Sequence, residues 1–345
     1  MAVADIDFQA VPPPPARFGE TQAGDAVSFV QIRNGSVAAN LMTWGASLQD
    51  LRHERLPHAL VLGSPRFEPY LGKMRFFGAV VGRVANRIAD GRATIDGQPL
   101  ALDRNEDGRT MLHGGRTGTG TVNWTLEGSD ETSCRFSLIC RDGQDGFPGN
   151  LSLSVTYRLE ADGTLVFEAE GRTDAPTFCN LAHHAYWKLD GRPDLSGHRM
   201  IVNATHYLPV DERQIPSGDP APVEGTRFDF RGPRPVVGAN DPLLDHNFCL
   251  VRSEGLRPAC SLRTDLAQLD VETTEPGLQV YEGRLIDTAP APGHGGTPYG
   301  ARAGVAIEPQ GWPDAPNRAE FPSVRLEPGD TYRQISRFRV SLPTS

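Results

Sequence analysis

The stretch Leu151-Ser-Leu-Ser-Val-Thr-Tyr-Arg-Leu159 alternates apolar and polar side chains without a break. Successive side chains of a β-strand point to opposite faces, so this pattern predicts a half-buried strand. Dipeptides of the Asn-Gly and Asp-Gly type favour tight hairpins, and they recur along the chain at 34–35, 90–91, 96–97, 107–108, 142–143, 162–163 and 190–191. Between them, further strands are predicted at 27–32, 93–95, 135–140 and 164–170.

The chain lacks long stretches with apolar residues at helical spacing. Strands without intervening helices argue against a parallel sheet built from βαβ units. We therefore expect an all-β protein with one domain, a large antiparallel β-sandwich over residues 18–345. Long connections are expected at 210–246 and 286–303. Residues 1–17 end in a run of four prolines and are expected to form a flexible arm.

Composition narrows the possible partners. Of 345 residues, 38% are hydrophobic and 22% charged, which suits a soluble globular protein with a substantial core. The net charge of −9 argues against a nucleic-acid partner. No signal peptide and no apolar run of the ~20 residues needed to cross a bilayer is visible, so we expect no membrane partner and a cytoplasmic location. A monomer and a homodimer both stay open.

The five cysteines are odd in number and show no C-x-x-C spacing. This favours reduced thiols over disulfides or a zinc site. Cys179 lies beside a histidine-rich segment and could act as a nucleophile, but free cysteines are more often small buried apolar residues.

The segment Asn180-Leu-Ala-His-His-Ala-Tyr-Trp-Lys-Leu189 holds two histidines beside two aromatic residues. Imidazoles titrate near neutral pH, and an aromatic face can stack against the C–H surface of a sugar ring. The combination suggests acid–base chemistry on a carbohydrate. The alternative is a buried strand whose histidines only satisfy backbone groups.

Four other segments carry side chains suited to binding a sugar, and each has an ordinary structural explanation. Asn86 and Arg87 suit a vicinal diol, or Arg87 is a paired surface residue. His113 precedes two glycines and could bind a hydroxyl or cap a turn. Asp245 begins a strand, where Asp is usually a turn former. Glu308 follows an apolar run and lies either in a cleft or at an exposed strand end.

Together these segments resemble the aldose 1-epimerase (galactose mutarotase) family in order and spacing, from about residue 20 to the C-terminus. The similar stretches are 82–91, 112–115, 142–149, 180–189, 207–211, 223–226, 245–250, 275–283 and 308–323. The resemblance implies a mutarotase-type β-sandwich with a sugar-binding cleft, and an isomerase that interconverts the α and β anomers of a free monosaccharide.

By the same resemblance, His184 is the general acid and Glu308 the general base. The substrate-binding residues would be Asn86, Arg87, His113, Tyr186, Asp245 and Gln279. No metal and no other cofactor is expected. The chain has His183 where the family commonly has Asn, and Ala185 where it often has a small polar residue, which bears on the sugar preference.

The expected chemistry opens and recloses a cyclic hemiacetal. Ionised Glu308 would take the proton of the C1 hydroxyl while protonated His184 donates to the ring oxygen, with the two groups on opposite sides of the ring. Asp245 would favour the cationic form of His184. Tyr186, Trp187 and Trp312 are candidate stacking surfaces.

Other functions stay open on the sequence. A non-catalytic sugar-binding sensor, or an epimerase for a modified sugar, would keep most of these residues. A glycosidase would pair Glu308 with Asp245. A metal enzyme could use His113, His183, His184 and Glu308. Adjacent histidines on a strand point to opposite faces, however, so His183 and His184 would not normally share one site.

Overall fold

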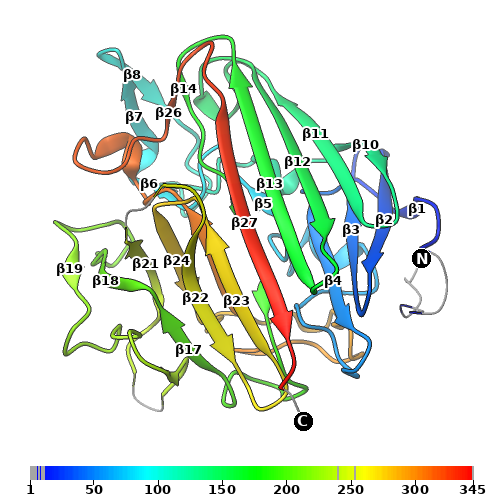
Figure 1. The fold of residues 1–345 in the computed structure, drawn as a ribbon. Coiled ribbons are helices and arrows are strands. Elements are labelled where there is room, and N and C mark those ends of the chain that lie inside the picture. The colour runs from blue at the N-terminus through cyan, green and yellow to red at the C-terminus, as the bar shows by residue number, and fades with distance from the viewer. Residues whose placement is uncertain (1–5, 7, 9–11, 239–240, 252–253, 344–345) are drawn as a thin grey trace.

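The computed structural model describes residues 6, 8, 12–238, 241–251 and 254–343 (Figure 1). Most of the expected arm at 1–17 therefore lies outside the described residues. The first strand, β1 (Ala16–Glu20), already begins inside the span expected to be flexible.

A nine-stranded antiparallel sheet forms the broad face seen in Figure 1. Its strands, in spatial order, are β10 (Thr125–Ser129), β11 (Ser133–Cys140), β12 (Leu151–Leu159), β13 (Thr164–Thr173), β27 (Tyr332–Ser341), β23 (Gln268–Thr273), β22 (Arg257–Arg263), β17 (Arg199–Val202) and β20 (Arg234–Pro235). The C-terminal strand β27 fills the centre, where it pairs with β13 and β23.

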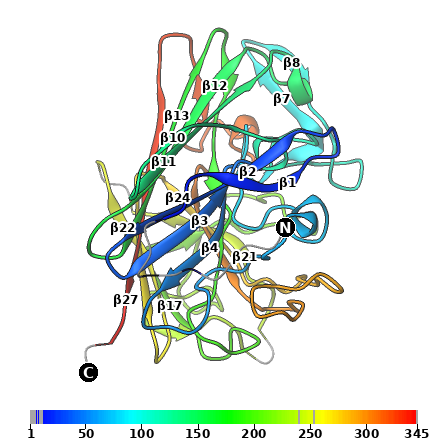
Figure 2. The same cartoon turned by 90° about the vertical axis from the view of Figure 1, so that its right-hand side faces the viewer.

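Two further sheets lie behind it. A six-stranded sheet has the order β16 (Tyr186–Trp187), β25 (Val305–Gln310), β24 (Gly277–Tyr281), β21 (Asp245–Leu250), β18 (Ala204–Tyr207) and β19 (Ala221–Pro222). A four-stranded sheet runs from β1 through β2 (Ala26–Asn34) and β3 (Val37–Met42) to β4 (Ser47–His53). Figure 2 shows these strands crossing the long strands of the large sheet, where β2 contacts β10, β11 and β12.

Short paired strands complete the fold. They are β5 (Val80–Val81) with β15 (Ala182–His183), β6 (Arg87–Ile88) with β9 (Met111–Leu112), β7 (Arg92–Ile95) with β8 (Gln98–Ala101), and β14 (Thr177–Phe178) with β26 (Arg325–Leu326). The helical elements of the described chain are short 3-10 turns: η1 (Glu68–Leu71), η2 (Ala89–Gly91), η3 (Thr119–Thr121), η4 (Gln144–Gly146) and η5 (Ala315–Asn317). No helix in the described part of the chain is long and apolar enough to cross a membrane.

The expected antiparallel β-sandwich is confirmed. The strand predicted from the alternating stretch is β12, with the predicted bounds, and its pattern of burial alternates as expected. The other predicted strands fall within β2, β7, β11 and β13. The dipeptides at 34–35, 96–97 and 162–163 close the hairpins β2–β3, β7–β8 and β12–β13.

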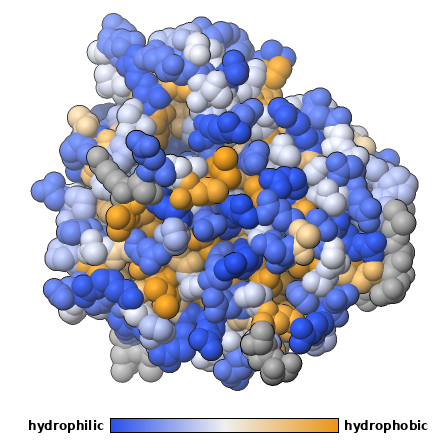
Figure 3. All heavy atoms as spheres, viewed as in Figure 1, coloured by the Kyte–Doolittle hydropathy of each residue, from blue (hydrophilic) through white to orange (hydrophobic). Residues whose placement is uncertain are grey.

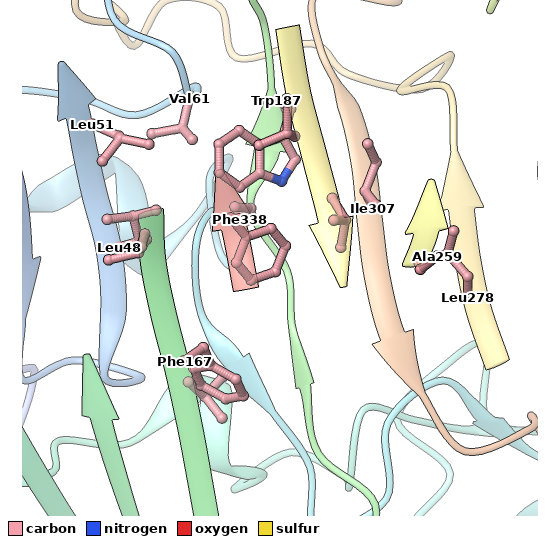
Figure 4. Packing of buried hydrophobic residues seen from close by; sticks show 14 of the residues in the cluster. Leu48, Leu51, Val61, Phe167, Trp187, Ala259, Leu278, Ile307 and Phe338 are labelled. Atoms are coloured by element: carbon pink, nitrogen blue, oxygen red, sulfur yellow. The ribbon is translucent and has the colours of Figure 1, made fainter. Parts of the chain in front are cut away.

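The hydrophobic core lies between the nine-stranded sheet and the two sheets behind it. In Figure 4, Leu48 of β4 and Ile307 of β25 approach Phe167 and Phe338 of the large sheet. The Trp187 indole stacks on Phe338 with ring centroids 5.2 Å apart. Trp187 is fully buried, so the prediction that it offers a stacking surface to a sugar is wrong.

The outer face of the large sheet is polar. Blue, hydrophilic side chains cover most of the face in Figure 3. Ion pairs cross between its strands, such as Arg337 with Glu272 and Arg339 with Asp270. One face of this sheet therefore supplies the core, while the site described next lies on the six-stranded sheet.

Candidate active site

Strand alternation places several polar residues on the face of the six-stranded sheet that points away from the core. On β25, Val305 and Ile307 enter the core, so Glu308 points to the other face. On β24, Leu278 is in the core and Gln279 faces outward from it. The same alternation on β16 explains why Trp187 is in the core while Tyr186 lies on the site face.

Strand register brings these side chains side by side. Gln279 lies directly opposite Glu308 on one side and opposite Asn247 on the other. Its amide nitrogen donates a hydrogen bond of 2.6 Å to Oδ1 of Asp245. Gln279 and Glu308 are 3% and 2% exposed, whereas Asp245 is half-buried. The carboxylates thus run from a fully buried position at Glu308 to a partly exposed one at Asp245.

His184 is fixed by backbone hydrogen bonds to a neighbouring segment. Its N–H donates to Ala79 O at 2.8 Å, and the N–H of Gly78 donates to its carbonyl at 3.0 Å. Gly78 has a φ of 70°, and a Cβ at this position would lie 1.9 Å from the carbonyl oxygen of Leu48. Only glycine allows this close approach, which holds residues 76–79 against the histidine.

The structure brings His184 and Glu308 together. Nε2 of His184 lies 3.7 Å from Oε1 of Glu308, and both side chains are buried. Within the described structure, Glu308 Oε2 and His184 Nδ1 have no hydrogen-bond partner. The Tyr186 ring packs beside His184 with centroids 5.1 Å apart. The acid and base candidates therefore lie next to each other, and not on opposite sides of a ring as expected.

Burial disfavours the charged form of both groups. It lowers the pKa of His184 to about 4. Burial also raises the pKa of Glu308 well above its usual value, an effect that the nearby charge of Asp245 reinforces and that of Arg87 opposes. The expectation that Asp245 keeps His184 protonated near neutral pH is wrong, because desolvation dominates the pKa of the imidazole. The favoured state of the pair therefore carries a single proton, shared between His184 and Glu308.

His113 and Asn86 support each other in a tight loop contact. The N–H of Asn86 donates to Nδ1 of His113 at 3.2 Å, and the N–H of His113 donates to Asn86 O at 2.9 Å. Both residues adopt left-handed backbone, with φ of 61° and 51°. Because Nδ1 accepts a hydrogen bond, a neutral His113 carries its proton on Nε2. Its ring lies 5.2 Å from that of His184.

The pKa of His113 lies well below its usual value. Burial is the main cause, and the positive charges of His184, Arg87 and Arg75 add to it. His113 is thus a neutral hydrogen-bond donor at the edge of the His184 site.

Arg87 is the cation whose charge acts on the carboxylates of Glu308 and Asp245. Burial raises the pKa values of both Glu308 and Asp245, and the charge of Arg87 opposes that rise. Its Nε and Nη2 donate to the two carboxylate oxygens of Glu106 at 2.8 and 2.7 Å. Glu106 was not among the residues predicted from the sequence. The sequence signal that could have identified it is its position in the loop between Arg87 and His113, seven residues before His113.

Phe76 is a second residue that sequence reasoning missed. Its half-buried ring lies 4.9 Å from that of His113 and is stacked on that of His184 at 6.2 Å. It occupies the position expected of a stacking surface. The sequence signal was the aromatic pair Phe76-Phe77 directly before Gly78.

Other candidates lie elsewhere. The ring of His183 packs among those of Tyr157, Phe167 and Phe338, on the core side. Trp312 packs edge-to-face on Phe321. Among the described residues, no group of three or more His, Cys, Asp or Glu side chains is arranged to hold a metal ion.

Cys179 is fully buried, and burial raises the pKa of its thiol far above the usual value. A thiolate at this position is therefore disfavoured, and the nucleophile hypothesis for Cys179 finds no support.

Comparison with known proteins points to one family. The family model for aldose 1-epimerase matches residues 28–339. A galactose mutarotase from Rattus norvegicus is 39% identical over 338 residues, covering 94% of this chain and 97% of the relative. An aldose 1-epimerase from Escherichia coli is 34% identical, covering 92% of this chain and 96% of the relative.

Solved structures agree. A GalM/aldose epimerase homologue from C. elegans superimposes with a TM-score of 0.86 at 30% identity, covering 92% of this chain and all of the homologue. A galactose 1-epimerase from Lactobacillus acidophilus gives a TM-score of 0.82 at 25% identity, covering 96% of this chain and 98% of the other. Fold and sequence agree, and the chain belongs to the aldose 1-epimerase family.

Proposed function

We propose that this protein interconverts the α and β anomers of a free aldose, with His184 and Glu308 transferring the protons. The observation that carries the proposal is the 3.7 Å separation of His184 Nε2 from Glu308 Oε1 in a buried setting. The C1 hydroxyl and the ring oxygen of a pyranose are bonded to the same carbon. Two groups lying side by side can therefore reach both oxygens at once.

The proton balance follows from one proton shared by the pair. In the ring form, Glu308 is a carboxylate and His184 an imidazolium. Glu308 takes the proton of the C1 hydroxyl, the C1–ring-oxygen bond breaks, and His184 protonates the ring oxygen. The open-chain aldehyde rotates about C1–C2. The ring then recloses as the hydroxyl returns its proton to His184 and the carbonyl oxygen takes one from Glu308.

Burial supports this cycle energetically. The open-chain state leaves His184 neutral and Glu308 protonated, which is the pairing that burial favours. Burial therefore favours the proton transfers of ring opening, while the positive charge of Arg87 stabilises the carboxylate of Glu308 in the ring form. General acid–base participation of this kind gives about 10²–10⁴-fold per group.

The remaining polar groups would hold the sugar. Asp245 and Arg87 present an acceptor and a donor for neighbouring hydroxyls, and the Nε2–H of His113 is directed by its hydrogen bond to Asn86. Gln279 holds Asp245 through its amide nitrogen, and its own Oε1 is buried without a partner in the described part of the protein. Tyr186 and Phe76 supply aromatic surface. Several relatives are named galactose mutarotases, so galactose is the first sugar to test.

The test follows the optical rotation of freshly dissolved α-galactose and α-glucose. The wild-type protein should speed the approach to equilibrium, and Glu308→Gln and His184→Asn should each lower kcat by about 10²-fold or more. The exposed residues Glu212 and His206 provide matched controls. Glu212→Gln and His206→Asn should keep wild-type rates.

Two other results would be decisive. Sugar binding by the wild-type protein without any acceleration would indicate a non-catalytic sensor. Near-wild-type rates in both Glu308→Gln and His184→Asn would show that these residues do not carry the reaction.

The five cysteines are free thiols, which supports a cytoplasmic location as part of the proposal.

A further inference from the structure

Arg75 is a cation beside the site, and no carboxylate of the described residues pairs with it. Arg87, the other arginine near the site, is neutralised by two hydrogen bonds to Glu106. The Arg75 guanidinium donates a hydrogen bond from Nη2 to the backbone oxygen of Arg116, at 3.3 Å. Asp103 attracts Arg75 from a distance, but its ion pair, at 3.6 Å, is with the side chain of Arg116. No described carboxylate forms an ion pair with Arg75.

Arg75 directly precedes Phe76, the aromatic residue that lies beside the two histidines. Its guanidinium carbon lies 5.0 Å from the centroid of the Phe76 ring, and that ring contacts both His113 and His184. The segment is anchored because Gly78 and Ala79 hydrogen-bond to the backbone of His184. Phe76 therefore fixes the half-buried guanidinium close to the histidines.

Electrostatic effects indicate on which side of the site Arg75 lies. Its positive charge contributes to lowering the pKa of His113. The charges that act on Glu308 are instead those of Asp245 and Arg87. This agrees with the contacts, because the Arg75 guanidinium lies over the Phe76 ring, which packs against His113.

The orientation of the sugar follows from the proposed function, on which this inference rests. The ring oxygen of a pyranose is bonded to C1 and C5 alone. If Glu308 meets the hydroxyl on C1 and His184 meets the ring oxygen, C5 and its exocyclic carbon lie on the far side of the ring oxygen from Glu308. The contacts of His184 lead to His113 and, through Phe76, to Arg75, so these are the groups that the exocyclic carbon would meet.

We propose that Arg75 binds an anionic group on the exocyclic carbon, so that the preferred substrate is an acidic aldose. A guanidinium offers a planar fork of donors that matches a carboxylate or a phosphate. Burial lowers the pKa of Arg75, because its charge is partly removed from water without a paired anion. A neutral hydroxyl leaves that charge unpaired, whereas an anion neutralises it through charge-assisted hydrogen bonds.

The experiment compares mutarotation rates for galacturonate, galactose 6-phosphate, galactose and xylose. Xylose has no exocyclic carbon and serves as the internal reference. We expect the wild-type protein to show a kcat/KM at least about 10-fold higher for one acidic sugar than for galactose. Galacturonate and the phosphate ester distinguish a carboxylate site from a phosphate site.

The matched variants are Arg75→Gln and Arg116→Gln. Arg75→Gln should lower the ratio of kcat/KM for the acidic sugar over xylose by about 10-fold or more. Arg116 is an exposed neighbour that is already paired with Asp103, and Arg116→Gln should leave this ratio unchanged.

Two results would overturn the inference: a wild-type protein that prefers galactose to both acidic sugars, or an Arg75→Gln variant whose rates fall equally for every sugar. Failure of the proposed function looks different, because then no sugar in the panel would be accelerated by the wild-type protein.

Discussion

The carboxylate of Glu106 accepts two hydrogen bonds from the Arg87 guanidinium, from Nε at 2.8 Å and from Nη2 at 2.7 Å. This bidentate contact occupies one edge of the guanidinium and leaves Nη1 for other partners. It also balances a positive charge that acts on Glu308 and Asp245. Glu106 therefore positions Arg87 and limits its effect on the proposed base.

Replacing Glu106 with glutamine should shift the pH dependence of catalysis. Without the Glu106 charge, the positive charge of Arg87 stabilises ionised Glu308 more strongly and lowers the pKa of that carboxyl. The alkaline limb of the kcat/KM profile should move to lower pH, and KM should rise because Arg87 is less well oriented. Rates measured by polarimetry between pH 4 and 10 test this expectation.

Glu272→Gln is the control for this change, since Glu272 faces Arg337 on the outer face of the large sheet. An unshifted alkaline limb in Glu106→Gln, with only an overall loss of folded protein, would mean that Glu106 is merely structural.

The wild-type protein should give a bell-shaped pH profile with a broad plateau. The active state holds one proton on the His184–Glu308 pair. Adding a second proton requires charging the buried His184, whose pKa is lowered to about 4, so the acid limb should lie near that value. Removing the shared proton leaves a buried carboxylate, so the alkaline limb should lie well above the usual pKa of a glutamate.

The profile of kcat/KM reports the free protein and is the one to measure, with the spontaneous rate subtracted at each pH. Because the two groups interact, the limbs belong to the pair and not to either residue alone. An acid limb near pH 6.5, the ordinary value for histidine, would contradict the buried one-proton state.

The amino-acid sequence predicted the architecture well because the fold depends on local signals. The alternation at 151–159 and the Asn-Gly and Asp-Gly turns are readable one segment at a time. The resemblance then named residues that strand register places side by side, as for Gln279 and Glu308. The choice between Tyr186 and Trp187 as a site residue also needed the structure, because the packing of Trp187 on Phe338 shows which of them faces the main core.

What the sequence did not reveal depends on three-dimensional environment. A pKa follows from burial and from charges brought in by distant segments, so the protonation of His184 could not be inferred from its neighbours in sequence. Glu106 and Phe76 belong to loops without regular periodicity. Their roles appear only when the loops pack around His113.

The core histidine His183 should make the protein sensitive to acid. It lies among aromatic rings, its two ring nitrogens have no partner in the described structure, and burial lowers its pKa from 6.5 to about 3. The folded state thus takes up this proton only at much lower pH than the unfolded state. Its contribution to stability is complete above pH 6.5 and is lost as the pH falls toward 3, by about 1.4 kcal/mol per pH unit.

Replacing His183 with leucine should remove this loss. The melting temperature of His183→Leu should fall less than that of the wild type between pH 6.5 and 4.5, while the exposed control His206→Leu should follow the wild type. Parallel melting curves for all three proteins would contradict the assignment.

Glu275 should act in the opposite pH range. The side chain is 8% exposed, and burial raises its pKa to about 8 against the opposing charge of Arg257. The folded state therefore binds the proton more tightly than the unfolded state, whose glutamate has a pKa near 4.5. Stability linked to Glu275 is fully present below pH 4.5 and is lost as the pH rises to about 8, at about 1.4 kcal/mol per pH unit.

Glutamine imitates the protonated carboxyl and cannot ionise. Glu275→Gln should match the wild type near pH 4.5 and gain in melting temperature relative to it as the pH rises toward 8. Thermal unfolding followed by circular dichroism at several pH values measures the difference, with the exposed Glu212→Gln as control. A difference that stays constant with pH would show that Glu275 is already ionised in the folded protein, because only a group that titrates differently in the two states makes stability depend on pH.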